Sequence, residues 1–266
     1  MTDREFFALV VYVFAGIYGL CIGSFLNVVI YRTPLGMSVA KPSSHCPTCQ
    51  NPIAWYDNIP VLSYLLLGGK CRHCKTHISF RYTIVEITNA LLWLLGAFLF
   101  LPKGLPYVLI AAAASSLLLC VFFIDLEHKI ILDRFQIMLG VLAVLVTVLD
   151  TLRDQTAWIP HLIGGIVGYG VLWLIGFCGE KILKREALGG GDVKLCGVMG
   201  LFLGWKLFLL SILVASVAAC VVLLSLRFVR KDEEKEYPFA PFLACGFALA
   251  MFFGDTILSW YLSLLI

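Results

Sequence analysis

The sequence predicts an all-α polytopic membrane protein of about eight transmembrane helices. Two observations predict this fold class. Hydrophobic residues make up 61% of the 266 residues and charged residues only 14%, against roughly 45–50% and about 25% in an ordinary soluble domain. The apolar residues also gather into runs long enough for helices of about 20 residues, the length that crosses the hydrocarbon core of a bilayer.

The predicted spans follow one another through short connections, with one polar stretch after the first. We expect them near residues 6–31, 83–101, 105–124, 135–150, 160–180, 192–204, 206–226 and 241–264. Gly16, Gly19 and Gly23 share one face of the first span at i, i+3 and i+7. That spacing predicts close packing against another helix, not a cofactor motif.

The distribution of basic residues predicts the orientation, because Lys and Arg near the ends of spans stay in the cytoplasm. In the eight-span arrangement 16 of the 20 Lys and Arg residues lie on one side, and only Arg4, Lys103, Arg153 and Lys206 lie on the other. The first side is therefore expected to be the cytoplasm, with both chain ends outside. Topology accounts for the basic residues, so the net charge of +3 gives no indication of nucleic-acid binding.

Residues 32–82 form the one substantial polar insertion. It is too small to bury a large hydrophobic core, so it needs a stabilising cross-link such as a disulfide or a bound metal ion. Two CxxC pairs, Cys46-Pro-Thr-Cys49 and Cys71-Arg-His-Cys74, are separated by 21 residues, close to the spacing of a four-thiolate zinc site. Two disulfides or four idle thiols are the alternatives, but a reducing cytoplasm disfavours disulfides. Four thiolates leave no open position for water, so we expect the zinc to be structural.

These features predict three parts of the chain. Residues 1–31 form the first transmembrane helix, residues 32–82 a cytoplasmic four-cysteine zinc domain between the first and second helices, and residues 83–266 the main membrane domain. The six remaining cysteines lie singly in apolar runs, where small packing residues are expected.

Two aspartates lie where apolar runs meet polar loops. Asp125 ends the third span, and Asp192 follows Gly189, Gly190 and Gly191 at the start of the sixth. Placing a carboxylate at a membrane edge costs free energy, so such a residue usually has a functional role. Two such groups facing one cavity cannot readily be ionised together, so they would share a proton as in an aspartic protease. Both aspartates fall at the predicted cytoplasmic ends of their spans, as a shared site requires.

Each aspartate also has a structural interpretation. Asp192 would cap the helix that follows it, with the glycines forming the turn. Asp125 would be an interfacial residue beside Glu127, His128 and Lys129. On the other hand, glycines before Asp192 would let a substrate backbone approach the carboxylate. The residues alone leave both interpretations open.

Several longer motifs occur along the chain. They are residues 23–32 (Gly-Ser-Phe-Leu-Asn-Val-Val-Ile-Tyr-Arg), the two CxxC pairs, residues 57–63 (Asp-Asn-Ile-Pro-Val-Leu-Ser), residues 78–82 with Glu86, Asp125, residues 186–195, and Pro-Phe-Ala-Pro at 238–241. With these motifs, in this order, the chain resembles the bacterial type IV prepilin peptidases, membrane aspartic proteases of the Gly-x-Gly-Asp class. The resemblance covers nearly the whole chain, although Ala240 stands where the family commonly has glycine.

The resemblance implies that residues 83–266 are a membrane peptidase domain with Asp125 and Asp192 as the catalytic pair. Gly189, Gly190 and Gly191 would form the loop along which the substrate approaches. The implied substrates are type IV prepilins or the pseudopilins of type II secretion, whose short basic leader is cut after a glycine. Cleavage would occur at the cytoplasmic face of the bacterial inner membrane. The expected partners are these substrates and the lipid bilayer, with no nucleic acid, and the oligomeric state is left open.

Many members of this family also N-methylate the new terminal residue with S-adenosylmethionine, especially those with the cysteine-bearing insertion. The resemblance therefore implies a bifunctional enzyme with S-adenosylmethionine as a cofactor beside the structural zinc. The sequence has no nucleoside-binding fingerprint. Polar residues in and around the insertion are the candidate contributors to cofactor binding: Asn27, Arg32, Asp57, Asn58, Arg81 and Glu86.

Two other functions fit parts of the pattern. An intramembrane protease of the Gly-x-Gly-Asp type without methyltransferase activity would use the same acids, but the cysteine insertion argues against it. An ion-coupled or proton-coupled transporter would also show about eight spans, helices broken near glycines, and membrane acids. Cleavage of a purified prepilin discriminates the peptidase from the transporter.

Overall fold

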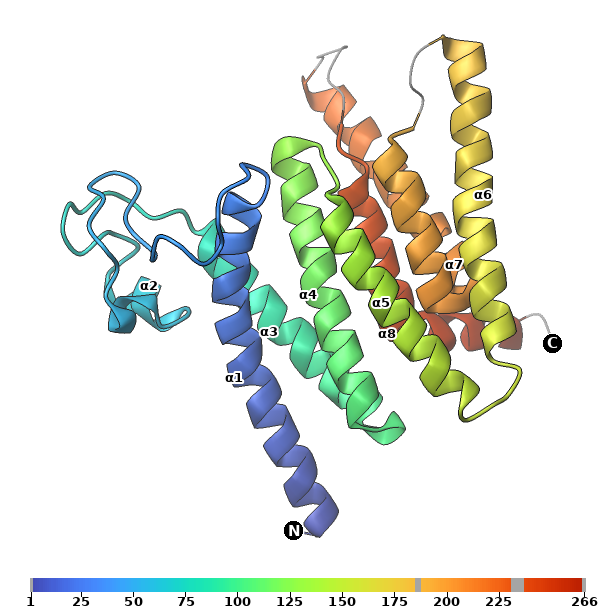
Figure 1. Cartoon of the computed structure of the whole chain (residues 1–266), viewed down its shortest axis with the longest axis horizontal. Helices are drawn as coiled ribbons and strands as arrows, with labels where there is room; N and C mark the ends of the chain where they lie inside the picture. Colours follow the sequence, from blue (N-terminus) through green and yellow to red (C-terminus); the bar gives the residue numbers. More distant parts are fainter. Residues whose placement is uncertain (1, 185–187, 231–236, 265–266) are drawn as a thin grey trace. The chain divides into compact units, whose positions relative to one another are not determined.

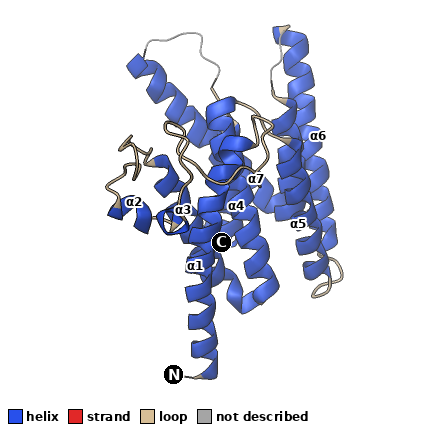
Figure 2. Cartoon of the chain, turned by 60° about the vertical axis from the view of Figure 1, so that its left-hand side comes forward, coloured by secondary structure: helices blue, strands red, loops and turns tan. Residues whose placement is uncertain are grey.

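The computed structural model of the chain describes residues 2–184, 188–230 and 237–264 (Figure 1). This part of the chain consists of helices and loops, with two isolated β-bridges and no strand (Figure 2). Seven of the helices are long and apolar enough to cross a membrane, which confirms a multi-pass membrane protein. The chain divides into two compact units, Met1–Cys120 and Val121–Ile266.

The first unit is built on α1 (Asp3–Arg32) and α3 (Arg81–Phe100), with the short η1 (Trp55–Asn58), α2 (Leu62–Leu66) and η2 (Leu101–Lys103), and the first part of α4 (Leu105–His128). A capping box fixes the start of α1. The Thr2 hydroxyl accepts the Glu5 N–H at 3.3 Å, and the Glu5 carboxylate accepts the Thr2 N–H at 2.7 Å. Two backbone N–H groups that a helix start leaves unpaired are thereby satisfied.

Helices α1 and α3 pack backbone to backbone at the predicted glycine face. A Cβ added at Gly19 would lie 2.7 Å from the Ala90 Cα, and one at Gly23 would lie 2.7 Å from the Glu86 Cα. Gly16 belongs to the same face and lies against Leu94. The predicted close helix contact is therefore confirmed, and its partner is α3.

A buried polar network reinforces this contact. The Asn89 side-chain amide of α3 donates to the Gly19 carbonyl of α1 at 2.7 Å. The Ser116 hydroxyl of α4 donates to the Asn89 side-chain carbonyl at 2.7 Å, and the Trp93 indole donates to the Ser116 hydroxyl at 2.9 Å. Because lipid offers no alternative partners, such bonds help hold three apolar helices together.

The second unit contains the end of α4, α5 (Asp133–Thr151), α6 (Trp158–Leu183), α7 (Gly190–Arg230) and α8 (Ala240–Ser263). Helix α7 has 41 residues, but Gly204 within it is non-helical, with φ 75° and ψ 161°. Both ends of α7 lie on the same side of the unit in Figure 1, so the chain reverses at this glycine. The predicted spans 192–204 and 206–226 are the two arms of α7, which reconciles eight predicted spans with seven assigned helices.

Glycines also let α6 contact the first arm of α7 directly. A Cβ at Gly168 would collide with the Cys196 carbonyl oxygen, and one at Gly200 would collide with the Gly164 carbonyl oxygen. The second arm meets α8 in the same way, because a Cβ at Gly246 would collide with the Ser211 carbonyl oxygen. These positions were not among the residues predicted from the sequence. Their signal is the repeated Gly-x-x-x-Gly spacing at 164–168 and 200–204.

Two alanine substitutions on α6 should test this packing. Gly168→Ala should lower the free energy of unfolding by about 1–3 kcal/mol, because the new methyl group has to displace backbone. Gly170→Ala is the matched control, since nothing lies within 4 Å of a Cβ there. It should be neutral or stabilising by up to about 1 kcal/mol. Unfolding in detergent, followed by circular dichroism, measures both, and equal effects of the two substitutions would contradict the packing argument.

Candidate functional site

Asp125 lies near the end of α4 and is 6% exposed. Its Oδ2 accepts the backbone N–H of Ala240 at 3.1 Å. Ala240 is the first residue of α8, and the first N–H groups of a helix have no acceptor within that helix. The Pro-Phe-Ala-Pro segment therefore starts α8 at a place where the Ala240 N–H, which has no acceptor within the helix, can donate to Asp125. Ala240 is absent from the residues with positive φ, so this turn has no need of the family's glycine.

Asp192 is the third residue of α7. Its Oδ1 is buried, and no hydrogen-bond partner for it exists among the described residues. Its carboxyl group lies within electrostatic range of Asp125. The hydrogen bonds of the described chain include none from a backbone N–H to the Asp192 carboxylate, so the capping interpretation has no bond to support it.

Helix α5 holds the start of α7. The Gln136 side-chain amide donates to the Gly191 carbonyl at 3.1 Å, and Gln136 is buried. The Lys194 ammonium donates to Asp133 at 2.9 Å on the exposed side. Gln136 was not among the candidate residues predicted from the sequence. The available signal was a polar residue on an apolar helix, three positions after Asp133.

The three glycines before Asp192 lie at the helix start. Gly190 and Gly191 belong to the first turn of α7, and Gly189 immediately precedes it. A Cβ at Gly189 would lie 3.2 Å from the Asp192 Oδ2, whereas a Cβ at Gly190 would meet nothing within 4 Å. The backbone beside the carboxylate is thus uncovered at Gly190. Glu186, from the same motif, lies outside the described residues.

The four cysteines of the insertion come together as a cluster whose sulfur atoms all lie within 4.8 Å of one another. The Cys46 and Cys74 sulfurs are 3.7 Å apart, and the Cys49 and Cys71 sulfurs are 4.0 Å apart. A tetrahedral four-thiolate site with metal–sulfur bonds of about 2.3 Å has sulfur–sulfur edges of about 3.8 Å. The cluster therefore has the dimensions to hold a metal ion such as zinc.

The two CxxC pairs adopt the same turn. Each pair is followed by a residue in the left-handed region, Gln50 with φ 58° and Lys75 with φ 60°. The N–H of each of these residues returns to the carbonyl of the first cysteine, at 2.8 Å for Cys46 and 3.1 Å for Cys71. The repetition is mainly one of backbone geometry, since the residues between the cysteines and directly after them differ.

The surroundings of the thiols lower the pKa of Cys46 and Cys74 and raise the pKa of Cys49. The Thr76 hydroxyl and backbone lower the pKa of Cys74 to about 6, and backbone N–H groups within the first turn lower the pKa of Cys46. The Asn51 N–H favours the thiolate of Cys49, but burial and the neighbouring cysteines outweigh it and raise its pKa to about 11. Without a cation the cluster is only partly ionised, so metal binding would release protons.

The structure separates the six candidate cofactor residues into two groups. Arg32 and Asn58 line the same cavity, of about 380 Å³. The other four are not among the residues that line it. Asn27 donates to the Tyr82 carbonyl at 3.0 Å, Asp57 pairs with Arg72 at 2.6 Å, Arg81 lies over the Tyr82 ring, and Glu86 accepts the Val61 N–H at 2.8 Å.

Comparison with known proteins yields two family models. The bacterial Peptidase A24 N-terminal domain matches residues 17–100, which include the cysteine cluster. The type IV leader peptidase family matches residues 112–224, which include Asp125 and Asp192. No solved structure matches the chain.

The curated relatives carry the name prepilin leader peptidase/N-methyltransferase. The protein from Aeromonas salmonicida (strain A449) is 33% identical over 93% of this chain and 92% of its own length. The chain belongs to this family. The relative from Pseudomonas aeruginosa is 32% identical over 92% of the chain and 91% of its own length. The Myxococcus xanthus relative is 40% identical over 79% of the chain, a match that spans 61% of that protein. This prepilin leader peptidase/N-methyltransferase family member is accordingly a peptidase with methyltransferase activity.

Proposed function

We propose that this enzyme removes the short basic leader from type IV prepilins or type II secretion pseudopilins, with Asp125 and Asp192 as its catalytic pair, and then N-methylates the new terminal residue. The observation that carries the peptidase proposal is the pairing of two acids from distant helices. Asp125 at the end of α4 is within electrostatic range of Asp192 at the start of α7, and Asp192 keeps a buried oxygen that has no hydrogen-bond partner among the described residues. Such an oxygen is available to a water molecule or to a substrate.

The chemistry is that of an aspartic protease, in which the two carboxyl groups share one proton. The ionised aspartate accepts a proton from water as the water oxygen attacks the scissile carbonyl carbon. The protonated aspartate donates its proton to the carbonyl oxygen, and the tetrahedral intermediate then collapses as the leaving nitrogen takes up a proton. The Ala240 N–H holds the Asp125 carboxylate in place, and Gln136 anchors the turn that carries Asp192.

The proposed place of cleavage is the cytoplasmic edge of the bacterial inner membrane. A basic leader stays in the cytoplasm while the apolar helix that follows it lies in the bilayer, so the scissile bond falls at the membrane edge. The uncovered backbone at Gly190 supports an approach path for an extended substrate segment beside Asp192.

Asp125→Asn and Asp192→Asn should each lower prepilin cleavage by at least about a hundredfold, because either change removes one acid-base group. The matched control is Asp133→Asn, which alters an exposed aspartate whose ion pair with Lys194 contributes little. Cleavage of purified prepilin in detergent measures all three. Cleavage at the wild-type rate by both Asp125→Asn and Asp192→Asn would end the dyad hypothesis.

The four-cysteine cluster is proposed to hold one structural zinc ion through Cys46, Cys49, Cys71 and Cys74. When bound, the ion would join the two CxxC turns of an insertion that contains only two short helical segments. Four thiolates close the coordination sphere, so the ion has no open position for a catalytic water.

Metal analysis should find about one zinc per chain in the wild type. Replacing Cys49 and Cys71 together by serine should abolish it, whereas Cys178→Ser on α6 should leave it unchanged. Zinc affinity should fall by at least about tenfold per pH unit as the pH is lowered through neutrality, because Cys49 binds zinc only after losing its proton. Zinc retained by the double variant would show that the cluster is not the site.

The methyltransferase half of the proposal uses S-adenosylmethionine as the donor. The free amine of the newly exposed terminal residue would accept the methyl group that S-adenosylmethionine supplies when bound, with release of S-adenosylhomocysteine and a proton. The relatives' name supports this activity, and the insertion with its flanking helices in the first unit is the proposed region.

Wild-type enzyme should transfer one labelled methyl group to each cleaved pilin. With a pilin supplied already cleaved, Asp192→Asn should still methylate, because its change lies in the peptidase chemistry. Mass spectrometry of the product measures both reactions. Full cleavage without any methylation by the wild type would instead favour a protease without methyltransferase activity.

A further inference from the structure

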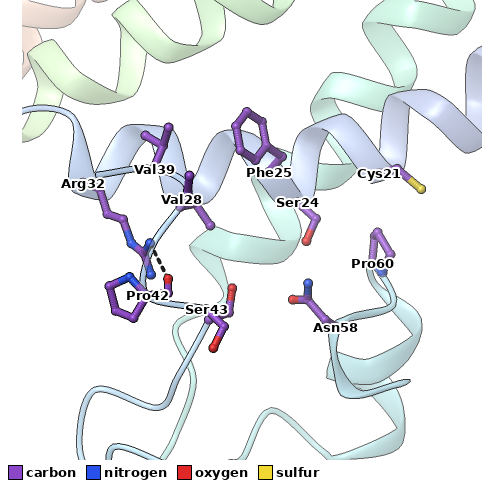
Figure 3. Close-up of a pocket in the computed structure, with 12 residues that line it drawn as sticks. Cys21, Ser24, Phe25, Val28, Arg32, Val39, Pro42, Ser43, Asn58 and Pro60 are labelled. Carbon is purple, nitrogen blue, oxygen red and sulfur yellow. Dashed lines mark hydrogen bonds between the residues drawn. The ribbon is translucent and has the colours of Figure 1, made fainter. Parts of the chain in front are cut away.

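A cavity of about 380 Å³ lies in the first unit between α1 and the insertion. Ser24, Val28 and Arg32 of α1 form one wall, residues 39–40 and 42–44 a second, and Asn58 with Pro60 a third (Figure 3). Its volume falls within the range of small-molecule sites, roughly 300–1,000 Å³. All of its walls belong to one compact unit.

Arg32 is the one charged residue among those that line the cavity. Its residue exposure is only 6%. The Nη1 atom donates to the Ser38 carbonyl at 3.1 Å and to the Pro42 carbonyl at 2.8 Å. These contacts fix the orientation of the guanidinium but do not neutralise it.

No carboxylate of the described chain pairs with Arg32, whose Nε and Nη2 have no hydrogen-bond partner there. A buried charge is costly unless it is paired. Guanidinium also matches the planar fork of a carboxylate better than any other side chain does. The cavity is therefore built to receive an anionic group at its Arg32 end.

We propose that Arg32 binds the carboxylate of S-adenosylmethionine, so that the methyl donor occupies this cavity. The proposal rests on the methyltransferase activity proposed above. Ser24 and Asn58 supply neutral hydrogen-bonding groups on two walls, which suit the uncharged polar groups of a nucleoside. Phe25, Val28 and Pro60 supply apolar surface. A phospholipid phosphate offers similar anionic oxygens, so the test has to distinguish the two ligands.

The test compares two nucleosides that differ in the carboxylate. S-adenosylhomocysteine has it, and methylthioadenosine lacks the amino-acid end that carries it. Calorimetric titration of the full chain in detergent should show that Arg32→Gln weakens S-adenosylhomocysteine binding about ten- to a hundredfold, the effect of losing a charge-assisted bond. Methylthioadenosine binding should stay unchanged. Arg4→Gln, at the other end of α1, is the matched control and should bind both nucleosides as the wild type does.

The remaining outcomes overturn the proposal in distinguishable ways. Unchanged S-adenosylhomocysteine binding by Arg32→Gln, in an enzyme whose wild type methylates pilin, would refute the site but not the activity. Equal weakening of both nucleosides would mean that Arg32 only supports the loop. If Arg32→Gln bound both nucleosides as the wild type does but no longer bound phosphatidylglycerol, the cavity would be assigned to lipid. A wild type that neither binds a nucleoside nor methylates would refute the methyltransferase function itself, and this inference with it.

Discussion

Backbone contact at glycines is the constraint on which the rest of the structure depends. Between helices in lipid there is no hydrophobic force, so association relies on close packing and on hydrogen bonds between helices. Gly19 and Gly23 meet α3, Gly168 and Gly200 bring α6 against α7, and Gly246 meets the second arm of α7. Each contact excludes even a methyl group, so each sets the separation of two helices. The positions of the functional side chains follow from these separations.

The polar groups proposed to have a chemical role lie where helices begin or end. A helix start offers N–H groups without acceptors, and a helix end offers free carbonyls. Asp125 uses the first N–H of α8, and Gln136 uses the Gly191 carbonyl in the first turn of α7. Both contacts join elements that are distant in the sequence. Between these ends the helices pack mainly through apolar side chains, so the ends are where two acids can be held near water.

The insertion has a different physical basis. It has few buried apolar residues, and its order comes from turns, cysteines and carbonyl contacts. The two CxxC turns repeat one backbone geometry, which brings four sulfur atoms to the spacing of a tetrahedral metal site. Toward α1, carbonyls of residues 38 and 42 fix Arg32 without compensating its charge. The same segment thus combines a compact cysteine cluster with a cavity lined by Arg32, whose charge no acid of the described chain compensates.

The sequence by itself determined the helices and the kind of site. Hydropathy set the spans to within a few residues, because lipid requires apolar runs of defined length. Cysteine spacing predicted the cluster, and motifs pointed to Asp125 and Asp192. Only the tertiary structure revealed that α7 reverses at Gly204, that the Ala240 N–H faces Asp125, and that no acid of the described chain pairs with Arg32. Each of these facts depends on contacts between atoms that are distant in the sequence. The order of residue types does not specify such contacts, because they form only when the helices pack together.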